Sequence, residues 1–247
     1  MGKIIAIGGG SMEERETLAI DREVVRLTGS RCPRALFIPT ASYDNPERYD
    51  IFKDVYGGEL GCDTDVLNLL GVNPSGKELE EKILSSDLIY VSGGNTLKLM
   101  RRWRRLGVDR ILRTAHDRGI VLAGLSAGAI CWFKYGHSDS MSFYGREDWS
   151  YVRVKGMGLI NALGVAHYHA EGREEDFHRM VAKHPEVGIA IDNGCALEVV
   201  DGAYRLITSQ PGAHAYRVST RRGEVDVQRL EQTDKFRPMA ELLGRGH

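Results

Sequence analysis

The residues best suited to covalent chemistry form one pentapeptide, Gly124-Leu125-Ser126-Ala127-Gly128. It follows an apolar run, residues 120–123, that is typical of a buried strand, and it leads into small residues that suit a helix. A sharp strand-to-helix turn of this kind is a nucleophile elbow, in which flanking glycines avoid collision with neighbouring backbone and the apex side chain stands out of the sheet. This pattern predicts Ser126 as a nucleophile; the alternative is a glycine-rich loop with a capping serine.

A serine hydroxyl needs a base within hydrogen-bond reach, and the usual base is a histidine held by a third group. His167 and His169 follow an apolar run, residues 163–166, so we expect them on one face at the end of a strand. Asp192 and Asn193 follow the next apolar run and are the candidates for orienting a histidine. The resulting order of Ser, His, then acid or amide differs from that of the α/β-hydrolases.

Two other strand-like runs end in glycines, Gly8-Gly9-Gly10 and Gly93-Gly94. Adjacent glycines at a strand end leave N–H groups free to point at a ligand. If the second pair lies beside Ser126, a Gly93 or Gly94 N–H and the Ala127 N–H form an oxyanion hole; an ordinary turn capped by Asn95 or Thr96 is the alternative.

The same glycine pattern argues against a nucleotide site. The run at residues 8–10 lacks the third glycine of a dinucleotide fingerprint. No carboxylate or cysteine lies at metal-ligand spacing near the paired histidines. We therefore expect neither a metal nor another cofactor.

Strand-like and helix-like runs alternate along the first half of the chain, which predicts an α/β fold: a mostly parallel sheet with helices on both faces. The expected strands lie at residues 3–7, 34–40, 65–70, 87–91 and 120–124. Hairpin signals at Asp201-Gly202 and Arg221-Arg222-Gly223 predict an antiparallel C-terminal extension. We expect residues 131–133 to continue the helix after Ser126, residues 135–151 to form a loop over the site, and residues 1–247 to form a single domain.

Composition limits the partners. The chain has 247 residues, 42% hydrophobic and 27% charged, with a formal net charge of −1. No bulk positive field exists to attract nucleic acid or an anionic membrane, and the cations of residues 97–106 are interpreted as a solvated helix face. No apolar run has the length of a signal peptide or membrane span, and four scattered cysteines favour a reducing, cytoplasmic compartment. An antiparallel edge allows a homodimer without requiring one.

Several segments together resemble the peptidase E (aspartyl dipeptidase) and cyanophycinase family of serine peptidases, peptidase family S51. In chain order, they are residues 5–10, 36–42, 90–96, 124–129, 166–168 and 191–197. The resemblance implies a class I glutamine-amidotransferase-like (flavodoxin-like) fold, with serine in place of the usual nucleophilic cysteine. It also implies cleavage of small peptides, in peptidase E those with an N-terminal aspartate.

By position, the resemblance implies Ser126 as the nucleophile, His167 as the general base, and Gly94 and Ala127 as the oxyanion donors. Family members usually have a carboxylate where this chain has Asn193. Asparagine can hold a histidine tautomer but cannot stabilise an imidazolium by charge. Either Asn193 serves in this role, or the neighbouring Asp192 does, or the enzyme is weakened.

An acidic substrate side chain needs a cation, and we predict Arg173 for this role, with Asn95 assisting. The leading hypothesis is therefore a dipeptidase-like serine peptidase that acts through an acyl-enzyme. The alternative is a catalytically weak or repurposed member that binds a small acidic ligand or a protein partner. It is motivated by Asn193 and by His169, which stands where the resemblance implies an acidic residue. A glutaminase is disfavoured because serine occupies the elbow and Cys131 lies further along the helix.

Overall fold

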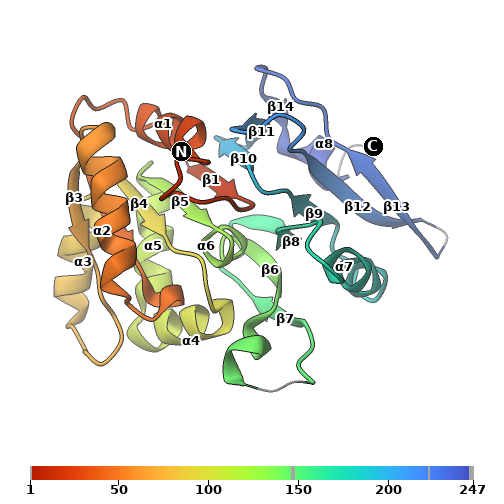
Figure 1. Ribbon diagram of the computed structural model, residues 1–247, viewed down its shortest axis with the longest axis horizontal. Helices are drawn as coiled ribbons and strands as arrows, with labels where there is room; N and C mark the ends of the chain where they lie inside the picture. Colours follow the sequence, from red (N-terminus) through yellow and green to blue (C-terminus); the bar gives the residue numbers. More distant parts are fainter. Residues whose placement is uncertain (1, 146–147, 222, 245–247) are drawn as a thin grey trace.

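The strands in the described part of the protein form two sheets (Figure 1). The computed structural model describes residues 2–145, 148–221 and 223–244. In this part of the chain the larger sheet has eight strands, in the order β14-β11-β10-β1-β5-β4-β2-β3. Their bounds are β1 (Lys3–Ile7), β2 (Arg34–Ile38), β3 (Asp63–Val66), β4 (Leu88–Val91), β5 (Val121–Leu125), β10 (Cys195–Val200), β11 (Ala203–Thr208) and β14 (Arg237–Pro238).

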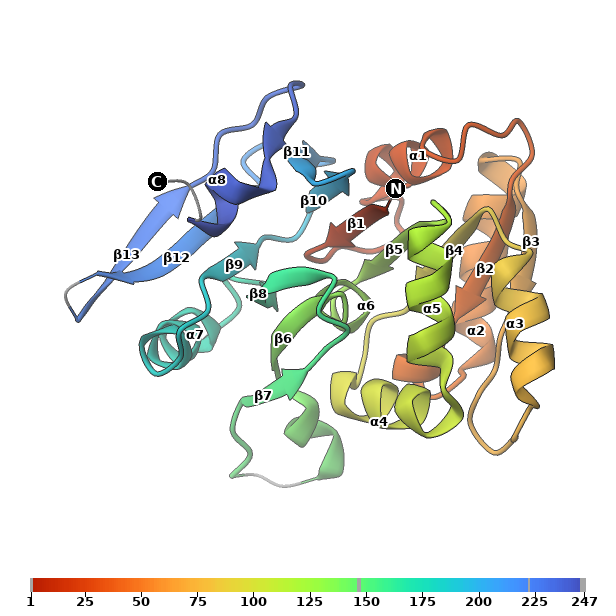
Figure 2. The same ribbon diagram turned by 180° about the vertical axis from the view of Figure 1, so that it is seen from behind.

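The parallel half of this sheet, β1-β5-β4-β2-β3, confirms the expected α/β arrangement. Alternate residues of its strands enter two different cores: Ile5 and Ile7 pack with one, Ile4 and Ala6 with the other. The first core is closed by α1 (Leu18–Arg26), α2 (Pro46–Phe52) and the π-helical η2 (Lys53–Glu59). The second is closed by α3 (Gly76–Leu84), α4 (Thr96–Leu106) and α5 (Val108–Asp117). Figures 1 and 2 show these layers from opposite sides.

Strand β3 ends earlier than the apolar pattern predicts. We expect a strand over residues 65–70, whereas the ladder with β2 ends at Val66. Beyond it, the N–H groups of Leu69 and Leu70 donate to the carboxylate of Asp44, at 2.7 and 2.5 Å. A side-chain acceptor thus takes the place of a neighbouring strand, which a local hydrophobic pattern cannot reveal.

The second sheet is a difference from the sequence prediction. Within the described residues it has six strands, in the order β13-β12-β9-β8-β6-β7, and β6, β8 and β9 pair in parallel. Their bounds are β6 (Phe133–Ser138), β7 (Val152–Lys155), β8 (Ile160–Ala166), β9 (Gly188–Ile191), β12 (Ala215–Arg221) and β13 (Glu224–Arg229). Helix α7 (Arg173–Ala182) packs against this sheet through β12 and β13.

The segment after Ser126 accounts for most of that difference. Helix α6 (Ala127–Ile130) ends before Cys131, and Phe133 begins β6 instead of continuing the helix. A Cβ at Gly164 would lie 2.6 Å from the Phe133 ring, so the ring packs directly on the bare backbone of β8. Residues 146–147 of the expected loop over residues 135–151 lie outside the described residues, and the described part includes strand and a 3₁₀ turn, η3 (Ser140–Tyr144). His137 is buried there and pairs with Asp176 of α7 at 2.9 Å, and burial lowers the pKa of His137 to about 4.

Both expected hairpins form, but they belong to different sheets. Strands β10 and β11 pair antiparallel around Asp201 and Gly202, whose positive φ values of 50° and 80° suit a type I′ turn. They extend the larger sheet, because β10 pairs antiparallel with β1. Strands β12 and β13 pair with each other and join the second sheet through β9, although Arg222 of the predicted turn lies outside the described residues. A short helix, α8 (Met239–Leu243), follows β14. None of the described helices has the length and apolar character needed to cross a membrane.

Candidate active site

Ser126 lies at the apex of a sharp turn between β5 and α6. Its φ and ψ are 54° and −110°, a conformation that a non-glycine residue rarely adopts. The flanking glycines permit the turn: a Cβ at Gly124 would lie 2.3 Å from the carbonyl oxygen of Gly128, and one at Gly128 would lie 2.1 Å from that of Val91. The Ser126 N–H donates to the Ile7 carbonyl at 3.0 Å, which fixes the turn against the end of β1.

His167 lies immediately after β8. The strand ends at Ala166, and His167 has a positive φ of 52°, so the expectation that His167 and His169 share one strand face is wrong. The His167 N–H donates to the Gly8 carbonyl at 3.1 Å, which fixes the histidine against the turn that follows β1. His169 points elsewhere: its ring nitrogens lie 3.2 Å from Glu174 Oε2 and 3.2 Å from the Tyr216 hydroxyl.

The ring of His167 is held by Asn193, whose Oδ1 lies 2.5 Å from His167 Nδ1. An amide oxygen only accepts, so Nδ1 carries the proton and Nε2 is left with a free lone pair. Burial lowers the pKa of His167, the hydrogen bond to Asn193 opposes that shift, and the positive charge of Arg173 adds to the lowering. The imidazole is therefore neutral, and able to accept a proton, at neutral pH.

Asp192 faces the other way. Its Oδ2 accepts from the backbone N–H of His214 at 3.0 Å, and its Oδ1 lies 3.5 Å from Nε2 of His169. Burial raises the pKa of the Asp192 carboxyl, while the hydrogen bond from His214 opposes that shift. Of the two neighbouring candidates, the structure brings Asn193, and not Asp192, against His167.

The glycine run after β1 has a role that the sequence did not reveal. A Cβ at Gly9 would lie 2.0 Å from Asn193 Oδ1 and 2.4 Å from His167 Nδ1. Gly9 therefore leaves the space in which the histidine and the asparagine meet. The strand followed by three glycines was visible in the sequence and indicated a close approach, but not which side chains make it.

The second glycine turn lies against Ser126, as the oxyanion prediction requires. A Cβ at Gly93 would lie 3.3 Å from the Ser126 Cβ, and one at Gly94 (φ 132°) would lie 2.2 Å from the Ala41 carbonyl oxygen. Within residues 2–145, 148–221 and 223–244, no backbone hydrogen bond uses the N–H of Gly93 or Gly94. Ala127 is the first residue of α6, where a helix leaves its N–H groups without intrahelical partners. These N–H groups are available to a ligand.

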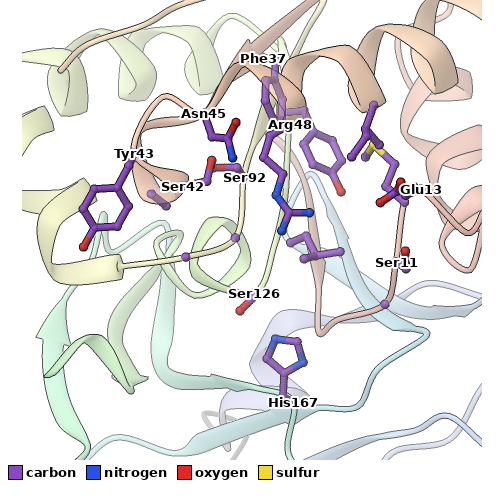
Figure 3. A pocket seen from close by; sticks show the side chains of 18 of the residues that line it. Ser11, Glu13, Phe37, Ser42, Tyr43, Asn45, Arg48, Ser92, Ser126 and His167 are labelled. Atoms are coloured by element: carbon purple, nitrogen blue, oxygen red, sulfur yellow. The ribbon is translucent and has the colours of Figure 1, made fainter. Parts of the chain in front are cut away.

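A cavity of about 480 Å³ opens above Ser126 and His167, in the size range of small-molecule sites. Figure 3 shows the Ser126 hydroxyl and the His167 ring near each other at its base. Its walls come from the turns after β1, β2 and β4 and from α2. A peptide of a few residues fits this volume.

Two charged side chains, Arg48 and Glu13, line the cavity. Arg48 extends from α2 towards Ser126 (Figure 3), and within the described ranges its guanidinium has no hydrogen bond or ion pair. A cation without a protein partner, in the cavity that also contains Ser126, is suited to binding the carboxylate of a ligand. Sequence reasoning missed Arg48, because a single arginine on a helix that follows a strand-end loop has no distinguishing pattern.

The two residues predicted to hold the substrate are occupied elsewhere. Asn95 is fully buried and caps α4: its Oδ1 accepts from the Lys98 N–H at 2.9 Å, and its Nδ2 donates to the Ser140 carbonyl at 3.3 Å. The alternative interpretation of Asn95 as a capping residue is the one observed. Arg173 forms an ion pair with Asp139 at 2.6 Å and lines a neighbouring cavity of about 460 Å³, which His167 also lines. Neither residue lines the cavity that contains Ser126.

No group of three or more His, Cys, Asp or Glu side chains in the described part of the chain is arranged to hold a metal ion. The chemistry available from Ser126, His167 and the turns beside them is that of a hydroxyl, a neutral imidazole and backbone N–H donors. This set is suited to acyl transfer.

Comparisons with known proteins agree with these features. Residues 4–207 match the protein family described as peptidase family S51. The "uncharacterized peptidase YgaJ" of Bacillus subtilis (strain 168) is 34% identical over 229 residues, which cover 91% of this chain and 95% of that protein. A solved peptidase from an acI-B1 actinobacterium superposes with a TM-score of 0.71 at 19% identity, covering 96% of this chain and 97% of its own. A putative peptidase E protein from Listeria monocytogenes EGD-e superposes with a TM-score of 0.61 at 20% identity, and the match covers 94% of this chain and 100% of that protein. At such identities the two structures show a shared fold.

Proposed function

The chain belongs to peptidase family S51, as its motifs predicted, and we propose that it is a serine peptidase that hydrolyses small peptides through an acyl-enzyme on Ser126. The observation that supports this most strongly is the hydrogen bond of 2.5 Å between Asn193 Oδ1 and His167 Nδ1, because it leaves Nε2 unprotonated in the cavity that also contains Ser126. The turn at Ser126 acts as the nucleophile elbow in this proposal.

The reaction follows from these positions. His167 Nε2 takes the proton of the Ser126 hydroxyl while Oγ attacks the peptide carbonyl carbon. The Gly94 and Ala127 N–H groups stabilise the oxyanion of the tetrahedral intermediate, and each such donor contributes about 3–4 kcal/mol. His167 then gives the proton to the leaving amine, and the acyl-enzyme forms. Water, deprotonated by His167, then attacks the ester, and His167 returns that proton to Ser126 Oγ as the acid product leaves.

The proposed substrate has an acidic N-terminal residue, as in a dipeptidase of the peptidase E type. The cavity of about 480 Å³ suits a short peptide, and Arg48 replaces Arg173 as the cation that we propose to bind the acidic side chain. Since Arg48 has no ion pair within the described residues, a substrate carboxylate can bind the guanidinium without first breaking such a pair. A charge-assisted hydrogen bond of this kind contributes about 1.5–3 kcal/mol.

The test is hydrolysis of three matched dipeptides, Asp-Leu, Asn-Leu and Lys-Leu, by the wild type and by R48Q. We expect the wild type to prefer Asp-Leu. R48Q should lower kcat/KM for Asp-Leu about 10- to 100-fold and change kcat/KM for Asn-Leu little, since only Asp-Leu loses an ion pair. R118Q, which removes an exposed arginine beyond α5, serves as the matched control.

An unchanged ratio of Asp-Leu to Asn-Leu in R48Q would contradict the assignment of Arg48. S126A gives the background rate. Hydrolysis by S126A at the wild-type rate would contradict catalysis by Ser126. If the wild type binds Asp-Leu but hydrolyses none of the three dipeptides, the alternative of a repurposed acidic-ligand binder is correct.

A further inference from the structure

A second hollow adjoins the cavity above Ser126. Tyr43 and Phe143 line both, and their rings lie 6.3 Å apart, centroid to centroid. The side chains are about 43% and 44% exposed, which is unusual for two adjacent aromatic residues. The second hollow has a volume of about 510 Å³. In Figure 3, Tyr43 lies at the edge of the view, away from Ser126. The two hollows are therefore continuous across this aromatic pair.

The second hollow is strongly cationic. Lys98, Arg101, Arg102 and Arg105 line it from one face of α4, at helical spacing, and no carboxylate is among its lining residues within the described ranges. Lys98 Nζ lies 3.6 Å from the centroid of the Tyr43 ring.

The positive charges of this hollow are only partly neutralised. The Arg102 Nε donates to the Leu69 carbonyl at 2.6 Å, so this side chain is held in place by backbone. Arg101 and Arg105 have no ion pair in the part of the chain that the structure describes. Like charges grouped on one helix face repel one another, so an anionic occupant would stabilise them.

We propose that this cationic groove, lined by Tyr43, Phe143 and the four cations of α4, binds an acidic extension of the peptide whose scissile bond lies at Ser126. The inference rests on the proposed function, which assigns the neighbouring cavity to the N-terminal residue, so the extension is C-terminal. Substrates then include acidic peptides longer than a dipeptide. The aromatic pair packs against the aliphatic parts of the peptide, and the guanidinium groups bind its carboxylates.

A peptide fits the groove better than nucleic acid does. The groove continues into a cavity in which the reactive groups are suited to acyl transfer, and the molecule as a whole has a net charge of −1. A phosphate backbone is held by charge spread along its length, whereas the described cations that line this groove all come from one helix, α4.

The test measures binding to the full chain carrying S126A, so it does not depend on catalysis. Two labelled peptides are compared by fluorescence anisotropy, Asp-Leu followed by four glutamates and Asp-Leu followed by four glutamines. We expect the first to bind at least tenfold more tightly in about 50 mM salt, with most of that preference lost in about 500 mM salt because the charges are solvent-exposed.

In the S126A chain, the double substitution R101Q/R105Q should abolish the preference for the glutamate peptide. In a chain that retains Ser126, R101Q/R105Q should hydrolyse Asp-Leu at the wild-type rate. R118Q/K183Q removes the same net charge from exposed positions elsewhere and should leave the preference intact. Equal binding of the two peptides would overturn the proposal. The proposal would also be overturned if a single-stranded oligonucleotide bound and R101Q/R105Q weakened that binding, while the glutamate peptide bound no more tightly than the glutamine peptide. Failure of hydrolysis with every peptide contradicts the proposed function alone, since binding is measured separately.

Discussion

Asn193 holds His167 by a hydrogen bond without contributing a charge. A carboxylate in this position would orient the ring and also favour the imidazolium form. Here the orientation is retained, with Oδ1 2.5 Å from Nδ1, while burial lowers the pKa of His167. The proposed base is thus ready to accept a proton over a wider acidic range than an ordinary histidine, but it holds that proton more weakly.

Substitutions at Asn193 separate these two effects. The proposed base must be neutral, so activity is lost as pH falls through the His167 pKa, which lies below its usual range near 6.5. N193D places a carboxylate against Nδ1 and should shift the acidic limb of kcat/KM upward by about one pH unit or more. N193A removes the constraint on the tautomer and should lower kcat by about 100-fold or more. The measurement is the pH profile of Asp-Leu hydrolysis.

We would conclude that Asn193 does not orient the base if N193D left the acidic limb of the kcat/KM profile in place and N193A kept full activity. If instead D192N shifts the limb, then Asp192 acts on His167 despite its contacts with His214 and His169.

The residues of the proposed chemistry could be identified from the sequence because each follows a buried strand. Ser126 has a distinctive spacing of glycines, and His167 ends an apolar run. Arg48 could not be found in this way, because the position of its guanidinium depends on how α2 packs over the sheet. The pairing of Asn193 with His167 also depended on a backbone rotation, the positive φ at His167, which no residue type announces.

At the scale of elements, the turn after β1 controls the approach of two other turns. Gly8 accepts from the His167 N–H at 3.1 Å, and Gly9 accepts from the Gly194 N–H at 2.9 Å. A bare backbone at Gly9 then lets the two side chains meet. The turn thus acts as a template that joins the end of β8 to the connection between β9 and β10.

G9A tests this role. The added methyl would lie 2.0 Å from Asn193 Oδ1 and 2.4 Å from His167 Nδ1, so the hydrogen bond between them must lengthen or break. Because the exposed Asn193 side chain can rotate away, we expect kcat/KM to fall at least tenfold, by the loss of orientation of the base, with only a small change in the thermal unfolding midpoint. Peptide hydrolysis and thermal unfolding are measured on the same preparation.

G76A provides the control, because a Cβ at Gly76 meets nothing within 4 Å at the start of α3. Wild-type activity in G9A would mean that the pair tolerates displacement and that the turn does not set its geometry.

Elements with a regular apolar pattern were predicted well, and those fixed by distant contacts were not. The parallel strands and both hairpins follow from local pattern and turn residues. Phe133 was expected in a helix because its neighbours are apolar, whereas its ring packs on Gly164 of β8, thirty-one positions away. Local periodicity cannot report a partner at that separation.

The whole molecule brings two sheets together at one cavity. The larger sheet supplies Ser126 after β5 and the glycine turns after β1 and β4, and the second sheet supplies His167 after β8. Asn193 lies where the chain crosses from β9 in the second sheet to β10 in the larger one. Relative movement of the sheets would therefore separate the proposed base from the proposed nucleophile.

The net charge of the whole chain does not show where charged side chains gather on its surface. A net charge of −1 excluded a strongly basic surface on average, yet α4 gathers four cations around one hollow. The motifs identified the family and thereby the fold, which the match to peptidase family S51 and the solved structures bear out. The second sheet was not anticipated, because the order of strands in a sheet is a long-range property.

Labelling by a fluorophosphonate tests the central proposal, that Ser126 is an activated nucleophile, most directly. The reagent forms a covalent bond only with a serine whose hydroxyl has an adjacent base. Mass spectrometry of the digested wild-type protein should locate a single adduct on the peptide that contains Ser126, and H167A should reduce its rate of formation about 100-fold or more. An unlabelled Ser126 in folded wild-type protein, or equal labelling in H167A, would contradict the account.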